Sequence, residues 1–127
     1  MDGTPMVIGV TGTPPAFLRD GDHVVCKSIT VASTARDAGA TPTTTLRAGL
    51  VLGKVTTGGL YKEYNHSLSD GTEVARGILM SELNLYDQYG TIRNKLALML
   101  VHGFCDSSLI YGSDSYAVTA LTMVSMT

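Results

Sequence analysis

The 127-residue chain lacks tryptophan and has only two phenylalanines, so its core must be built mainly from aliphatic side chains. Charged residues make up 16% of the sequence, too few for a disordered chain or a long solvated helix. No apolar run approaches the roughly 20 residues needed to cross a bilayer, so no membrane partner is expected. The length fits one domain that can bury a core without disulfides or metals.

Basic residues are also scarce. Nine Lys and Arg stand against eleven Asp and Glu, and the formal net charge of −2 excludes nucleic acid as the main partner. The N-terminus has no basic segment followed by an apolar one, so we expect synthesis in the cytoplasm without secretion. The two cysteines, Cys26 and Cys105, form no disulfide framework. Buried thiols are expected, although the sequence leaves a Cys26–Cys105 bridge open.

The residues that are abundant favour β-structure. Fourteen glycines among many Thr and Val residues are typical of short strands joined by tight turns. Strands are predicted over residues 24–32, 50–57, 60–64, 73–80 and 96–101. Gly58 and Gly59 predict a two-residue hairpin turn, because both can adopt positive φ, and Gly53 predicts a bulge or close backbone approach. The fold class is therefore all-β with little helix, as a sandwich or partly open barrel.

Three other segments carry weaker patterns. Residues 34–45 form a polar connector that is long enough to make contacts of its own. Residues 81–94 predict a loop with one helical turn, and residues 115–126 alternate loosely like an edge strand. Residues 96–101 are apolar on both faces, so this strand must be covered twice, by the domain's own core and by a neighbouring subunit.

We divide the chain into an extended N-terminal arm (1–22), a β-rich domain (23–112) and a C-terminal β-like tail (113–127). The arm contains a β-prone stretch, Met6, Val7, Ile8, Gly9 and Val10. Such a stretch is suited to joining the sheet of another protein as an added strand. It could equally be the ordinary first strand of the domain or have no role.

Side chains that could support catalysis or metal binding occur in unsuitable patterns. His23 with Cys26 and His102 with Cys105 together resemble a zinc ligand set, but residues three apart in a strand point to opposite faces. Cys105 could pair with His66 or His102 as a nucleophile and base, yet no sequence signature supports such a pair. We therefore predict no metal, no cofactor and no catalytic residue.

Two further sequence patterns contain residues typical of functional sites but lack the local geometry that those sites require. His66, Ser67 and Asp70 contain the residue types of a catalytic triad but lie within one turn. Residues 49–54 have glycines and a lysine without the spacing, the hydroxyl residue or the following helix of a phosphate-binding loop.

An ordered series of short segments carries a family resemblance. The segments are Ile29–Ser33, Leu46–Thr56, Gly59–Tyr61, Asp70–Gly71, Gly77–Leu79, Leu98–Phe104 and Leu109–Gly112. Together they resemble the lambda-type head decoration proteins of tailed bacteriophages over about residues 24–112.

This resemblance implies a β-clip or β-tulip fold, no enzymatic activity and no cofactor. It implies a homotrimer that binds the major capsid protein on the outer surface of the expanded head and stabilises the shell against DNA pressure. On this interpretation residues 6–10 are the expected capsid contact. Two alternatives remain: a trimeric β-barrel with a ligand or active site between subunits, and another virion component such as a tail or baseplate part.

Overall fold

The computed structural model describes residues 6–7, 18–121 and 124–126. Its strands are β1 (Met6–Val7), β2 (Leu18–Val31), β3 (Thr45–Leu46), β4 (Val51–Lys54), β5 (Tyr61–Glu63), β6 (Ala75–Leu79), β7 (Leu83–Asn84), β8 (Lys95–Cys105) and β9 (Val124–Met126). A 3-10 turn, η1 (Ser107–Leu109), and a six-residue helix, α1 (Ser115–Ala120), follow β8. None of the helices in the described ranges is long and apolar enough to span a membrane.

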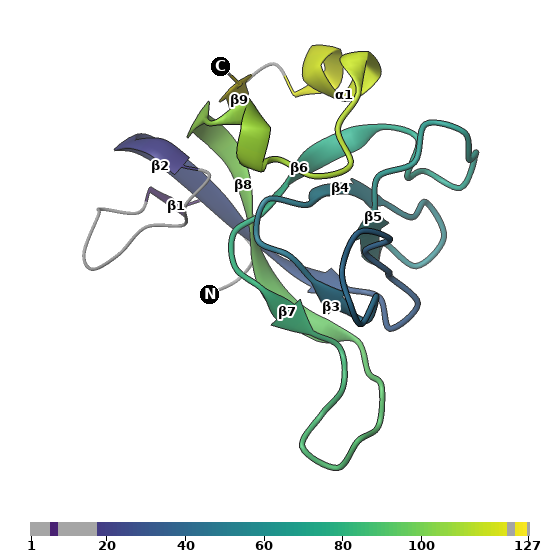
Figure 1. Cartoon of the computed structure of the whole chain (residues 1–127). Helices are drawn as coiled ribbons and strands as arrows, with labels where there is room; N and C mark the ends of the chain where they lie inside the picture. The colour runs from purple at the N-terminus through teal and green to yellow at the C-terminus, as the bar shows by residue number, and fades with distance from the viewer. Residues whose placement is uncertain (1–5, 8–17, 122–123, 127) are drawn as a thin grey trace.

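Five strands form a small, partly closed barrel (Figure 1). The main sheet has the order β1-β2-β5-β4-β6-β8-β9, and the long antiparallel pairing of β2 with β8 brings its two sides together. The parallel contact of β2 with β5 is confined to Val31 opposite Tyr61. The prediction of an all-β fold with a partly open barrel is confirmed.

Strand β8 separates two hydrophobic clusters. Leu100 belongs to one cluster, with Cys26 and Ile78, whereas its neighbour Met99 belongs to the other, with Leu52. Successive side chains of a strand point to opposite faces, so the apolar run is covered on both sides by the chain itself at these positions. Leu96 is the exception, because 78% of its surface is exposed.

The hairpin of β4 and β5 forms as predicted, but its turn is longer than predicted. Gly58 and Gly59 have φ angles of 89° and 73°. The Val55 N–H nevertheless donates to the Leu60 carbonyl at 2.8 Å, so four residues form the loop. The Thr56 N–H donates to the carbonyl of Asp70 in the neighbouring turn at 2.8 Å. The two-residue prediction is therefore wrong, and the loop is bonded to that neighbouring turn.

Gly53 shows both features predicted for it, an irregularity in the strand pairing and a close approach of another backbone segment. A register shift separates Leu52 from Gly53 in the pairing of β4 with β6. A Cβ atom at Gly53 would lie 2.6 Å from the Cα of Thr72, which no side chain could tolerate without backbone movement.

Two segments differ from their sequence predictions. Residues 81–94 contain no helical turn: they hold β7, paired with β3, and an antiparallel bridge between Tyr86 and Ile92. The first half of the tail is α1 rather than a strand, because Asp114 caps it by accepting the Ala117 N–H at 2.8 Å. Ala117 and Leu121 are buried four residues apart, which is a helical spacing.

Candidate functional site

The predicted capsid contact lies partly outside the described residues. Met6 and Val7 form β1, whereas Ile8, Gly9 and Val10 are outside the described ranges. Strand β1 runs antiparallel to β2, with Met6 opposite Cys26 and Val7 opposite Val25. Only two residue pairs hold β1 in place, so its main-chain hydrogen bonds are few.

The two cysteines lie in the two long strands of the barrel. Cys26 lies opposite Leu100 and Cys105 opposite Leu18, and both cysteines are buried without a disulfide. Burial raises the pKa of each thiol to about 11, which disfavours the thiolate that a nucleophile or metal ligand requires. Among the side chains that the structure describes, no group of three or more His, Cys, Asp or Glu could hold a metal ion.

The residues of the apparent triad are engaged elsewhere. The His66 ring stacks on the ring of Tyr116 at a centroid distance of 3.7 Å. The Asp70 carboxylate instead accepts hydrogen bonds from the hydroxyl and the N–H of Thr72. The sequence argument against a triad is therefore consistent with these contacts.

The connector 34–45 is organised around one buried carboxylate. Asp37 is 2% exposed and accepts from the Arg47 Nε at 2.8 Å and Nη2 at 2.9 Å, and from the N–H groups of Arg47 and Gly39. The Arg47 guanidinium also lies 3.6 Å from the centroid of the Tyr111 ring. This cluster fixes the connector to the end of the barrel, because a carboxylate with four donors holds both segments.

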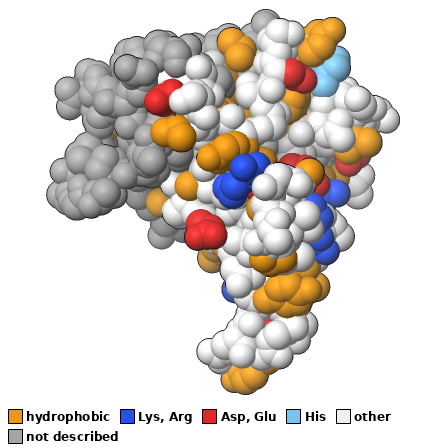
Figure 2. All heavy atoms as spheres, viewed as in Figure 1, with side chains coloured by type: hydrophobic (Ala, Val, Ile, Leu, Met, Phe, Trp, Pro, Cys, Tyr) orange, Lys and Arg blue, Asp and Glu red, His pale blue; other side chains and the backbone are white. Residues whose placement is uncertain are grey.

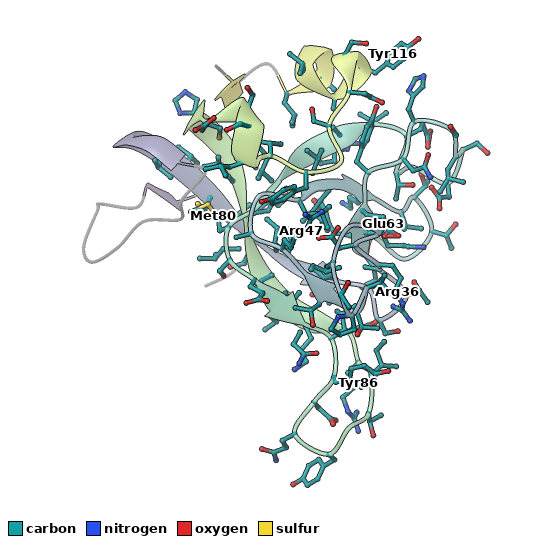
Figure 3. The ribbon with its side chains drawn as sticks, viewed as in Figure 1. Arg36, Arg47, Glu63, Met80, Tyr86 and Tyr116 are labelled. Atoms are coloured by element: carbon teal, nitrogen blue, oxygen red, sulfur yellow. The ribbon has the colours of Figure 1, made fainter. Side chains whose placement is uncertain are left out.

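Next to this cluster is a recess of about 240 Å³, with Arg36, Arg47 and Glu63 on its wall (Figure 3). The Arg36 side chain donates to the carbonyls of Ser33 and Ala35, and the Glu63 carboxylate accepts the Arg36 N–H at 2.9 Å. The charged groups therefore bind the chain's own loops, which indicates a structural role for the recess rather than a ligand site.

The Asp37 cluster should make stability depend on pH. Burial alone would raise the pKa of Asp37, but the hydrogen bonds and charge of Arg47 outweigh it and hold the pKa below the ordinary 3.8. Its contribution is therefore present above the ordinary pKa of 3.8 and is lost as pH falls through the lower folded-state pKa. Urea unfolding of the wild type and Asp37→Asn between pH 7 and 2 should give curves that converge below pH 4. Parallel curves would contradict this assignment.

A second ordered feature is the finger, which we define as residues 86–92. It projects from the barrel between β7 and β8 (Figure 1) and is closed by the Tyr86–Ile92 bridge. The Asp87 carboxylate organises its tip by accepting the N–H groups of Tyr89 and Thr91 and the Arg93 Nε at 2.5 Å. Tyr89 at the tip is 81% exposed. Sequence reasoning missed the finger, although Asp87 followed by Gly90 is a turn signal.

A third feature is the lysine hollow, a recess of about 390 Å³ on the barrel. It is lined by residues 27–30 of β2, Lys54 of β4, residues 58–61 and Leu96 of β8. The wall includes no Asp or Glu. Neither Lys27 nor Lys54 takes part in the two ion pairs found within the described ranges. Its wall therefore contains two lysines and no carboxylate among the residues that line it.

The model of the family of bacteriophage lambda head decoration protein D matches residues 17–98. The chain belongs to this family. The match begins just before β2 and ends within β8, so it includes most of the barrel and the whole finger, while α1 and β9 lie beyond it. No curated protein matches the chain.

Membership makes this chain a phage head decoration protein, a structural component that associates with the virion capsid. The family is structural rather than enzymatic, in agreement with the prediction from sequence.

Proposed function

We propose that the protein binds the outer surface of the expanded head as a homotrimer, is made in the cytoplasm of the host, and stabilises the shell against the pressure of packaged DNA. The family match carries this proposal. The neutral-to-acidic charge supports a protein partner, the major capsid protein, over DNA itself. Large apolar side chains left uncovered on the single chain, such as Leu96 and Tyr89, support contacts with other subunits.

The stabilisation follows from mass action. A protein that binds the expanded shell and not its precursor favours the expanded state by RT ln(1 + [L]/Kd), about 2.7 kcal/mol at a hundredfold excess over Kd. A trimer presents three arms. Once one arm is bound, the other two experience an effective concentration of about millimolar order, so that weak contacts sum to firm attachment.

The arm residues Met6, Val7, Ile8, Gly9 and Val10 remain our proposed capsid contact. A strand added to a capsid sheet gains main-chain hydrogen bonds without demanding particular side chains. The short β1, with two pairs to β2, supports this idea because few bonds would be exchanged when the arm binds a capsid edge.

Deleting residues 1–12 should leave a folded trimer that no longer remains on expanded heads. Sedimentation of heads with bound protein measures retention, and circular dichroism checks the fold. A matched variant with residues 6–10 replaced by a Gly-Ser segment of equal length should also be lost, because it keeps the reach of the arm but not its strand propensity. Full retention of either variant would refute the arm contact without refuting decoration.

A further inference from the structure

The edge of β2 that faces away from β8 is unpaired over a short stretch. On this side β1 pairs with β2 at Val25 and Cys26, and β5 pairs with it at Val31. Between them, residues 27–30 have no strand partner on this side within the described ranges. We call these residues the open edge, and at about 3.3 Å per residue it is about 13 Å long. All four residues also line the lysine hollow.

The register shows which backbone groups face the opening. Ser28 lies opposite Leu98, whose carbonyl accepts the Met80 N–H at 3.0 Å and so faces away from β2. The two residues are therefore a pair without mutual hydrogen bonds, and the Ser28 N–H and carbonyl point to the open edge. The same alternation appears at the end of the strand, where the Ala32 N–H donates to the Tyr61 carbonyl at 2.8 Å. An unpaired N–H and carbonyl on a sheet edge are a template for another strand.

One face of the sheet beside the open edge is basic. Lys27 and Val31 share this face, because they are four residues apart in β2. Val31 lies opposite Tyr61, and Tyr61 lies opposite Lys54, so Lys54 is on the same face. Neither lysine takes part in the ion pairs found in the described part of the chain. A carboxylate brought to this face would therefore meet two ammonium groups.

The other face beside the open edge is apolar. Leu96 of β8 lies opposite Thr30, which is three residues from Lys27, so Leu96 and Lys27 are on opposite faces. The Leu96 side chain is left uncovered by the chain's own two clusters. A single inserted side chain could not reach both faces, but an extended strand could, because its successive side chains point to the two faces in turn.

We propose that the open edge of β2 binds an extended segment of the capsid protein as an added strand. Its acidic side chains lie toward Lys27 and Lys54, and its apolar side chains lie toward Leu96. The inference rests on the proposed function, because it assigns a second contact with the same capsid. Main-chain hydrogen bonds to Ser28 supply affinity, and the alternation of acidic and apolar side chains supplies specificity.

Release of β1 would lengthen the open edge. The arm contact proposed above takes Met6 and Val7 away from β2, and this frees residues 25–26. The edge then covers residues 25–30, a stretch of about six residues that matches the usual length of a strand. The protein and the capsid would thus exchange strands, so that the bonds which β2 loses with β1 are replaced by bonds with the capsid segment.

The finger is the weaker candidate for a selective contact. In Figure 2 hydrophobic side chains show at its tip and again near its base. Its Asp87 is already paired with Arg93, and the Asp87 N–H donates to the Thr91 carbonyl within the turn. These contacts are internal, so they do not specify the charge or the backbone direction of a partner, whereas the open edge specifies both.

The affinity of the full-length protein for expanded heads, measured by sedimentation, tests the edge contact. Ser28→Pro removes the N–H that points to the open edge and leaves the pairing with β8 intact, because this N–H is not bonded to β8. The affinity should fall at least about tenfold, since a carbonyl of the capsid segment loses its donor. Wild-type affinity in a Ser28→Pro variant with an unchanged circular dichroism spectrum would overturn the inference.

Gln88→Pro is the matched control for the proline. Gln88 follows Asp87 in a turn that the Gly90 N–H closes on the Asp87 carbonyl at 3.1 Å, a position that favours proline. It is in the finger and outside the wall of the hollow. This variant should bind expanded heads as the wild type does, and an equal loss in both proline variants would show that the open edge has no special role.

A charge reversal tests the acidic character of the capsid segment without changing the backbone. Lys27→Glu should weaken binding to expanded heads at least about tenfold, because like charges then face one another. Arg76→Glu makes the same change of charge at an exposed position of β6 outside the hollow, and it should keep wild-type affinity. Equal affinities of the two variants would contradict an acidic segment at the open edge.

Hydrogen exchange identifies what covers the open edge. The Ser28 amide should exchange rapidly in the free protein and at least about tenfold more slowly on expanded heads, because it gains a hydrogen-bond partner there. Slow exchange in the free protein would show that the edge is already covered, by the chain's own N-terminal residues or by another subunit. That result would overturn the assignment to the capsid.

Wild-type binding separates this inference from the proposed function. A wild type that binds expanded heads, with Ser28→Pro and Lys27→Glu variants that bind equally well, would overturn the edge contact and leave decoration standing. A wild type that fails to bind expanded heads would overturn the proposed function itself.

Discussion

Replacing Gly71 by alanine is expected to lower the free energy of unfolding by about 4 kcal/mol, the sum of backbone strain and overpacking. Gly71 has a φ of 111°, a conformation that side chains rarely adopt. An added Cβ would lie 2.7 Å from the backbone nitrogen of Thr56 and closer still to the Lys54 carbonyl oxygen. These are backbone atoms that cannot move aside without disturbing the β4–β5 hairpin.

Gly58→Ala is the matched control for this substitution. Gly58 also has positive φ, at 89°, but no atom lies within 4 Å of the position that its Cβ would occupy. Gly58→Ala should therefore lower the free energy of unfolding only by the backbone strain of positive φ, about 1–2 kcal/mol. Urea unfolding of the two variants separates strain from steric overlap, and equal losses would show that the space at Gly71 is not limiting.

Replacing Arg47 by methionine is expected to cost about 3 kcal/mol, because it leaves the Asp37 carboxylate buried without its charged partner. The value lies at the lower end for such pairs because the Arg47 side chain is 33% exposed, so that water can partly replace it. The substitution also removes the guanidinium that lies over Tyr111. Urea unfolding at pH 7 measures the loss.

Two controls separate the causes of this loss. Arg93→Met removes the ion pair between Arg93 and Asp87, in which the arginine side chain is 64% exposed. This substitution should change the free energy of unfolding by no more than about 1 kcal/mol. Arg47→Lys keeps the charge but loses the bidentate geometry, so its stability should lie between those of the wild type and Arg47→Met. A loss at Arg47→Met no larger than at Arg93→Met would contradict a stabilising role for the buried pair.

The sequence could predict elements whose signals are local. The strand prediction for residues 24–32 rested on β-branched residues, and the one for residues 96–101 on an apolar run. Strand β2 ends at Val31, and residues 96–101 lie within β8. Gly53 and the Gly58–Gly59 pair were identified because glycine alone tolerates close approach and positive φ. The family resemblance rested on the order of these same local segments, and the family match bears it out.

The sequence pattern of the C-terminal tail predicted a strand where the structure has helix α1, whose capping residue also binds a distant side chain. Tyr116 and Val118 alternate like strand residues, yet both are exposed, and α1 forms because Asp114 caps its first turn while its carboxylate also accepts the Tyr64 hydroxyl at 2.7 Å. Burial and this hydrogen bond raise the pKa of Tyr64 to about 12, so the hydroxyl stays protonated as a donor. Fifty residues separate the two groups, which no local pattern can connect.

By itself, the sequence determined the all-β class, the main strands, the absence of a net basic charge and the decoration family, because each is written in composition or in contiguous residues. Only the tertiary structure decided that β2 and β8 close the barrel, that Arg47 donates to Asp37, and that Tyr89 is exposed at the tip of the finger. These features depend on pairings between residues far apart in the chain, whose geometry arises only when the strands have packed.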